Sequence, residues 1–305
     1  MNDIDTSAGL NERLHVAARH LATELVIRNV QEILSKEGID VLVLKGPHLG
    51  NTIYDDPLER EYIDLDLLVK PGRFQEVVRL LEQQGHRLLD DEEDRRATRK
   101  AFYCWKLQSP HGPVIELHSD LAGYGRYPVD VEGLFRRSVA FRMGNVEARG
   151  LGNEDLLMHL CLHITKSYFL VEEKHVRDIA LLTRKRPIRW EQFMELATQA
   201  GCRVGAYYAL RSAQAQFHAD IPSEVLQALR PGIIRRHWLD RYIDSDHFPM
   251  ARISGDRSLS YQARLGLPLL DRVSTWLPAL LRYAVIRLDD VRQGRKPSCI
   301  DRPEL

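Results

Sequence analysis

Cysteine is scarce in this 305-residue chain, and its spacing does not favour metal or disulfide chemistry. The four cysteines, Cys104, Cys161, Cys202 and Cys299, are far apart, and no Cys-x-x-Cys pair occurs. Cysteine-based zinc sites usually contain such pairs, and disulfide frameworks belong mainly to small secreted domains. The sequence therefore predicts thiols in a reducing compartment and argues against a cysteine-based metal site.

The chain also lacks an excess of charge of either sign and any long apolar run. Lys plus Arg and Asp plus Glu both number 43, whereas nucleic-acid-binding domains usually carry a clear basic excess. No run of about eighteen apolar residues is present, so we expect no membrane span. The first residues are polar and acidic, unlike the apolar core of a secretory signal. These absences predict a cytoplasmic protein that is not dedicated to nucleic acid or membrane.

Apolar periodicity predicts alternating helices and strands up to about residue 150. Helices are expected at 11–36, 48–54 and 74–84, the first ended by Gly38 and the last by Gly85. Short segments rich in apolar residues predict strands at 39–44, 63–69, 102–107 and 113–118, the last two antiparallel. The charged stretch 90–100 is expected to be a solvated loop or exposed helix. This order of elements is typical of an α+β domain.

Beyond residue 150 the pattern becomes helical. Asn153, Glu154 and Asp155 are placed to begin a helix that continues over 156–170, because a polar cap and early acids favour a helix N-terminus. Further helices are expected at 173–184, 190–201, 205–218 and 223–229, and a helical pattern resumes at 273–293. The sequence therefore predicts two domains, an α+β domain over 1–150 and a mostly helical domain over 151–305.

An alternation of acids and apolar residues distinguishes the strand expected at 63–69. Side chains two positions apart point to the same face of a strand, so Asp64 and Asp66 lie on one face. Glu116 shares a face with His118 in the strand expected at 113–118. Neighbouring carboxylates repel each other unless a cation lies between them, and magnesium takes oxygen ligands. A solvated edge strand gives the same alternation, so the acid pair alone leaves both interpretations open.

Short motifs follow one another in a defined order between residues 39 and 215. They are Val41-Leu-Val-Leu-Lys-Gly46, Tyr54-Asp-Asp-Pro57 with Arg60, Asp64-Leu-Asp-Leu-Leu-Val69, Ile115-Glu-Leu-His118, Leu156–His163 with Lys166, and Val176–Ala180 with Trp190. In combination they resemble the uncharacterised nucleotidyltransferase family of bacteria, a branch of the polymerase-β-like nucleotidyltransferase superfamily. Lys45-Gly46 stands where many relatives carry Gly-Ser.

The resemblance implies a small mixed β-sheet flanked by helices, followed by a mostly helical C-terminal domain that completes the active-site cleft. It implies that Asp64, Asp66 and Glu116 are the catalytic acids and the metal ligands. They would hold Mg²⁺, with two ions expected and Mn²⁺ as an alternative, and an NTP would be the co-substrate. In this superfamily the third acid, here Glu116, often activates the acceptor hydroxyl.

Five further residues are candidates for binding the nucleotide. Gly46 would allow a phosphate close to the backbone, although a plain strand-to-helix turn needs glycine equally. Lys45 is placed to contact phosphate or to pack. Arg60 would bind phosphate or form a surface ion pair with a neighbouring glutamate. His163 and Lys166 share one face of the expected helix, either as phosphate contacts or as ordinary helix residues.

The resulting hypothesis is an enzyme that moves an NMP or phosphate group from an NTP to an acceptor hydroxyl. A peptide, protein or small-molecule acceptor is favoured over nucleic acid because the net charge is zero. The alternatives are a catalytically inactive nucleotide-binding or interaction module of the same fold, a helical regulatory protein with solvent-facing acids, and a toxin-like nucleotidyltransferase acting on tRNA or protein.

Overall fold

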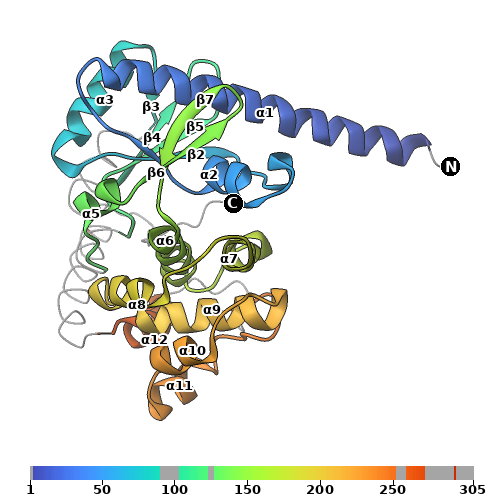
Figure 1. Cartoon of the computed structure of the whole chain (residues 1–305), viewed down its shortest axis with the longest axis vertical. Helices are drawn as coiled ribbons and strands as arrows, with labels where there is room; N and C mark the ends of the chain where they lie inside the picture. The colour runs from blue at the N-terminus through green and yellow to red at the C-terminus, as the bar shows by residue number, and fades with distance from the viewer. Residues whose placement is uncertain (1–2, 90–102, 123–126, 252–258, 272–291, 293–305) are drawn as a thin grey trace. The chain divides into compact units, whose positions relative to one another are not determined.

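The computed structural model describes residues 3–89, 103–122, 127–251, 259–271 and 292 (Figure 1). The chain forms two compact units, one comprising Met1–Leu121 and Asp130–Gly152, the other Ala122–Val129 and Asn153–Leu305. The charged stretch predicted at 90–100 and the helical pattern predicted at 273–293 lie outside the described residues, apart from residue 292.

A mixed sheet of seven described strands forms the centre of the first unit. The strands are β1 (Leu42–Val43), β2 (Asp64–Leu68), β3 (Arg87–Leu88), β4 (Cys104–Gln108), β5 (Val114–His118), β6 (Val139–Met143) and β7 (Val146–Gly150), in the spatial order β3-β4-β5-β2-β1-β7-β6. The pairs β2–β5 and β1–β7 are parallel, and the other neighbouring strands are antiparallel. This mixed sheet with its helices confirms the predicted α+β fold.

One face of the sheet is apolar and belongs to the core of the first unit. Leu65 and Leu67 of β2 and Ile115 and Leu117 of β5 are at most 1% exposed. They form one cluster with apolar residues of α1 (Asp3–Ser35) and α3 (Phe74–Gln83). Burying each such side chain contributes about 1.5–3 kcal/mol. The two-residue periodicity of the strands therefore directs every second side chain into this core and the others to the opposite face.

The connections between the strands are mostly short helices. Helix α2 (Lys45–Ile53) starts directly after β1 and packs against β2 and β6. Two 3-10 turns, η1 (Pro57–Glu59) and η2 (Pro71–Arg73), and helix α5 (Val131–Arg136) complete the unit.

The elements of this unit differ from the sequence predictions in three ways. First, strand β1 is only two residues long, and helix α2 begins at Lys45 instead of His48. The last hydrogen bond to the sheet is donated by the Leu44 N–H to the Asp66 carbonyl, and the helix starts at the next residue. Strand β3 and helix α5 were not predicted. The β6–β7 hairpin was also not predicted, although its turn at Gly144 (φ +54°) and Asn145 carries the residues that favour a tight hairpin.

The second unit is helical in its described part. Its helices are α6 (Asn153–Lys166), α7 (Glu173–Lys185), α8 (Trp190–Gln199), α9 (Arg203–Phe217), α10 (Ser223–Leu229), α11 (Ile233–Leu239) and α12 (Leu259–Leu269). Helices α6, α7 and α9 pack on one another, which agrees with the helices predicted for this half. Among the described residues, no helix combines the length and apolar character needed to cross a membrane.

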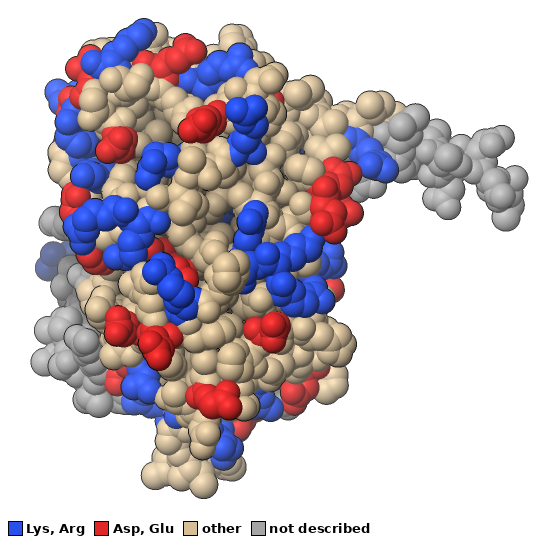
Figure 2. All heavy atoms as spheres, viewed as in Figure 1, with Lys and Arg blue, Asp and Glu red and all other residues tan. Residues whose placement is uncertain are grey.

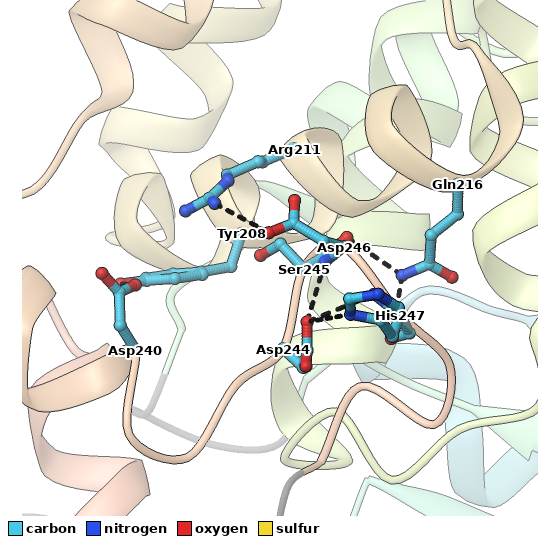
Figure 3. A network of polar contacts seen from close by, with 8 residues as sticks. All are labelled: Tyr208, Arg211, Gln216, Asp240, Asp244, Ser245, Asp246 and His247. Carbon is cyan, nitrogen blue, oxygen red and sulfur yellow. Dashed lines mark hydrogen bonds and ion pairs between the residues drawn. The ribbon is translucent and has the colours of Figure 1, made fainter.

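A polar network fixes the segment after α11 to α9 (Figure 3). The Tyr208 hydroxyl donates to Asp240 Oδ1 at 2.8 Å, and Gln216 Nε2 donates to the Ser245 carbonyl at 3.1 Å. Asp244 Oδ1 accepts the backbone N–H groups of the two residues that follow Ser245, at 3.0 and 3.2 Å. These bonds give the loop a defined path without regular secondary structure.

Candidate active site

The predicted acids come together on the face of the sheet opposite the apolar core. Strands β2 and β5 are parallel neighbours, and Asp66 is the register partner of Glu116. Neighbouring strands lie about 4.7–4.9 Å apart, and register partners point to the same face, so these two carboxylates stand side by side. Asp66 is 4% exposed and Glu116 7%. Asp64, half-buried, lies one pleat repeat earlier on β2 and shares this face.

Positive side chains balance these buried acids. Lys45 Nζ lies 3.3 Å from Asp66 Oδ1, and Lys106 Nζ lies 2.9 Å from Glu116 Oε1. His118 Nε2 is 3.0 Å from Asp66 Oδ1 and 3.7 Å from Glu116 Oε2. Burial of a carboxylate is costly unless a cation or hydrogen-bond donor compensates it. The strand register thus creates a negative cluster that the chain itself neutralises.

The donors of this cluster fit a magnesium ion. Magnesium takes carboxylate oxygens and often retains several waters, so it needs only one or two protein carboxylates. Asp66 and Glu116 provide two, side by side on a rigid sheet, and Asp64 provides a third on the same face. The lysine contacts show that a positive charge is favourable beside these carboxylates. A divalent cation would carry a greater positive charge than either ammonium group.

Gly46 has a packing role that the sequence did not reveal. A Cβ at this position would lie 2.9 Å from both Cβ and Cγ of Tyr62, closer than normal packing permits. Glycine therefore lets the first turn of α2 approach the chain just before β2. Lys45 begins the same helix and faces Asp66, so the predicted Lys-Gly turn does border the acids. Binding of phosphate by either residue stays a prediction.

The structure corrects one interpretation of Arg60. This side chain is 3% exposed, and its Nη1 donates to the Glu61 carbonyl at 2.6 Å. The surface position expected for this side chain is therefore wrong, because Arg60 is packed close to α2, with its Cβ 3.6 Å from the Cβ position of Gly50. Its predicted contact with phosphate is not tested by this arrangement.

The cationic helix face predicted in the second unit lies on α6. His159 is buried, and the half-buried His163 ring lies 4.6 Å from the ring of His175 on α7, measured between centroids. Lys166 is half-buried in the last turn of α6. Their roles toward a nucleotide stay predictions.

Two residues of the acid cluster were missed from the sequence, Lys106 and Cys104. Both lie on β4, antiparallel to β5, where Lys106 is the register partner of Glu116 and Cys104 that of His118. The predicted strand pair around residues 109–112 contained the necessary signal. Extending two-residue alternation across that hairpin would have placed Lys106 beside Glu116.

The chain was compared with curated proteins, solved structures and family models. No curated protein matches the chain. It is similar to a crystal structure of ANT(2")-Ia in complex with adenylyl-2"-tobramycin, with 13% identity, 58% of this chain and 95% of that chain covered, and a TM-score of 0.39. It is also similar to the lincosamide antibiotic adenylyltransferase LnuA bound to lincomycin. The identity is 13%, the match covers 54% of this chain and 97% of that chain, and the TM-score is 0.36. A third similar structure is that of an antigenic nucleotidyltransferase-like protein from Paracoccidioides brasiliensis. The identity is 18%, the match covers 64% of this chain and 96% of that chain, and the TM-score is 0.36.

A family model gives the assignment. The model described as uncharacterised nucleotidyltransferase matches residues 10–218, which include the acid-bearing strands, α2 and the helices α6 to α9. This span contains every motif on which the sequence resemblance rested. The chain belongs to the uncharacterised nucleotidyltransferase family.

Proposed function

We propose that the protein transfers a nucleoside monophosphate from a magnesium-bound NTP to an acceptor hydroxyl, with Asp64, Asp66 and Glu116 as the metal ligands. The observation that carries the proposal is the register pair of Asp66 and Glu116, two buried carboxylates side by side on parallel strands. Phosphoryl-transfer chemistry depends chiefly on positioning and on neutralising phosphate charge.

The residues of the cluster have complementary roles in this reaction. The acceptor oxygen attacks the α-phosphorus, the bond to the β-phosphate oxygen breaks, and pyrophosphate leaves with that bonding pair. Glu116 takes the proton of the acceptor hydroxyl. Lys45 and Lys106, which balance the acids in the free chain, hold phosphate oxygens of the NTP. Asp64, Asp66 and Glu116 would hold magnesium, which would supply positive charge to neutralise the triphosphate.

Further contacts to the nucleotide are proposed for the remaining predicted residues. Gly46 lies in the first turn of α2, where backbone N–H groups and the helix dipole favour an anion. His163 and Lys166 are proposed to bind the β- and γ-phosphates, together with Arg60. Substituting each of these residues separately and measuring the apparent affinity for NTP tests its proposed contact.

The acceptor is proposed to be the hydroxyl of a peptide, a protein or a small molecule. The chain has 43 basic and 43 acidic residues. On the face drawn in Figure 2, Lys and Arg side chains gather in places with acidic side chains beside them, and neither sign covers the whole face. A polynucleotide acceptor is usually bound by a continuous basic surface.

The deciding experiment is a transfer assay with the full chain. The protein is incubated with each isotope-labelled NTP and Mg²⁺ in the presence of hydroxyl-bearing acceptors, and mass spectrometry detects molecules that gain a nucleotide. The variant Asp64→Asn/Asp66→Asn is expected to form no product. Asp40→Asn, which changes an exposed aspartate before β1, is the matched control and is expected to retain activity. Product formation by the double variant at the wild-type rate contradicts the proposal.

A non-catalytic nucleotide-binding module is the second candidate. It is favoured by the observation that Asp66 and Glu116 are already neutralised by lysines, so their burial does not require a metal. Calorimetry with Mg-ATP separates the two functions when it is combined with the transfer assay. Binding without any product over many hours supports the module, whereas turnover supports the enzyme.

A further inference from the structure

A second set of possible metal ligands adjoins the acid pair on the same sheet face. Cys104 on β4 is the register partner of His118 on β5, and Glu116 lies two residues before His118 on the same face. One ligand atom from each residue lies within 4.8 Å of the other two. The cluster arises from strand pairing, which explains why cysteine spacing in the sequence did not indicate it.

The separations suit a small tetrahedral ion. Cys104 Sγ lies 3.7 Å from His118 Nε2, and Nε2 lies 3.7 Å from Glu116 Oε2. With zinc–ligand bonds of about 2.0–2.3 Å and tetrahedral angles, two ligands of one zinc ion are about 3.3–3.7 Å apart. The three donors therefore need only small side-chain adjustments to share an ion, and their strands already hold them in place.

The orientation of His118 also favours a ligand at this position. Its Nδ1 is buried and has no hydrogen-bond partner among the residues that the structure describes, so contacts of Nε2 orient the ring. Nε2 is the nitrogen that faces Cys104, Glu116 and Asp66. When Nε2 binds an ion, Asp66 gives up its contact with His118 and keeps its contact with Lys45.

The charge balance favours an ion that prefers sulfur. A thiolate, a carboxylate and a neutral imidazole together carry two negative charges, which a divalent ion cancels. Binding converts the Cys104 thiol to a thiolate and releases its proton to the solvent. The ion also replaces the Lys106 ammonium as the cation beside Glu116. Sulfur and imidazole ligands select zinc-like ions, whereas magnesium selects oxygen ligands.

We propose that Cys104, Glu116 and His118 form a binding site for one zinc-class divalent ion, with a fourth position open to water. The site shares Glu116 with the proposed magnesium site, but its sulfur ligand gives it a different metal preference. The proposal does not depend on nucleotidyl transfer, because it rests on the geometry and chemistry of its own three ligands.

The test uses Co²⁺ and Zn²⁺ with the chelator-treated full chain in the absence of nucleotide. We expect wild-type protein to bind one equivalent of Co²⁺, with a thiolate-to-cobalt charge-transfer absorption that stoichiometric Zn²⁺ abolishes. The variant Cys104→Ser is expected to lose this absorption. Loss of a residue that only contacts a metal ligand typically lowers metal affinity by about 10–100-fold. Cys104→Ser removes a ligand itself, so its Zn²⁺ affinity is expected to fall by more than this. Circular dichroism establishes that each variant is folded.

Two further variants make the result decisive. Cys299→Ser removes one thiol that lies outside the described residues, so it matches Cys104→Ser in cysteine count and should leave the absorption unchanged. His118→Gln should weaken Zn²⁺ binding without removing the thiol. The proposal is overturned by absence of the absorption in folded wild type, by full absorption in Cys104→Ser, or by its loss only in Cys299→Ser. Since no NTP is present, these outcomes are separate from failure of the transfer assay.

Discussion

The two faces of strands β2 and β5 have the same backbone and opposite chemistry. On one face, Leu65 and Leu67 contact the apolar cluster formed with α1 and α3. On the other face, Asp66 and Glu116 form a buried acid pair balanced by lysines. The apolar face is stabilised by removing surface from water, whereas the polar face is costly to bury and needs compensating charge.

The difference separates the residues that hold the fold together from those proposed to carry the chemistry. Asp66 and Leu67 are adjacent in β2, and both are buried. Their side chains point in opposite directions because the strand repeats every two residues. Substitutions at these two positions should therefore affect different measurements.

The largest expected effect is that of Asp66→Asn on the transfer rate. A metal site contributes several kcal/mol of charge stabilisation, so losing a ligand should reduce the rate by about a thousandfold. Steady-state transfer of label from the NTP measures this effect. The neighbouring variant Leu67→Ala should retain the wild-type rate per folded molecule. Equal losses in the two variants would mean that the two faces are not functionally distinct.

On the apolar face, Leu67→Ala should reduce the free energy of unfolding by about 2–5 kcal/mol. The side chain is 1% exposed, and its loss leaves a cavity between the sheet and its helices. Urea denaturation followed by circular dichroism gives the value. Leu14→Ala is the control, since Leu14 on α1 is 58% exposed and its removal leaves no internal cavity.

Gly46→Ala tests whether close packing defines the border of the polar face. The added methyl group would lie 2.9 Å from two atoms of Tyr62, and such overpacking should cost about 1–3 kcal/mol of stability. Gly72→Ala is the matched control, because its Cβ would meet no atom within 4 Å. The same unfolding measurement applies, and equal stability of the two variants would exclude the packing role.

The smallest expected effect concerns His86, a buried histidine that contrasts with the balanced acids. It is 3% exposed, and neither ring nitrogen has a hydrogen-bond partner among the described residues. Burial lowers the pKa of His86 below its ordinary value of 6.5. The unfolded chain therefore takes up a proton before the folded chain does as the pH falls below 6.5. Stability should be full above this pH and decline as the pH falls toward the lowered pKa.

Denaturant midpoints measured between pH 7.5 and pH 5 test this direction. His86→Leu removes the titrating group from a buried position and should make the decline shallower. His111→Leu, which replaces an exposed histidine and leaves His86 in place, is the matched control. A steeper decline in His86→Leu than in wild type would show that protonation of His86 favours the folded state.

Local patterns were sufficient to predict most elements and the faces of the important strands. The alternation in β2 correctly paired Asp64 with Asp66, and that in β5 paired Glu116 with His118. The missed β6–β7 hairpin also had a local signal in Gly144-Asn145. The length of β1 was not predictable in the same way, because it depends on where α2 begins.

The sequence by itself determined the periodicity, the identity of the acids and the family motifs, because each depends on residues close together in the chain. The tertiary structure decided that β2 lies beside β5, which brings Asp66 within 3.0 Å of a histidine 52 positions away. It also decided that Lys45 belongs to the same cluster, whereas the predicted pairing of β4 with β5 already implied that Lys106 and Cys104 lie beside Glu116 and His118. The pairing of strands that do not form a hairpin, such as β2 and β5, results from the packing of the whole sheet against its helices, and no local pattern encodes it.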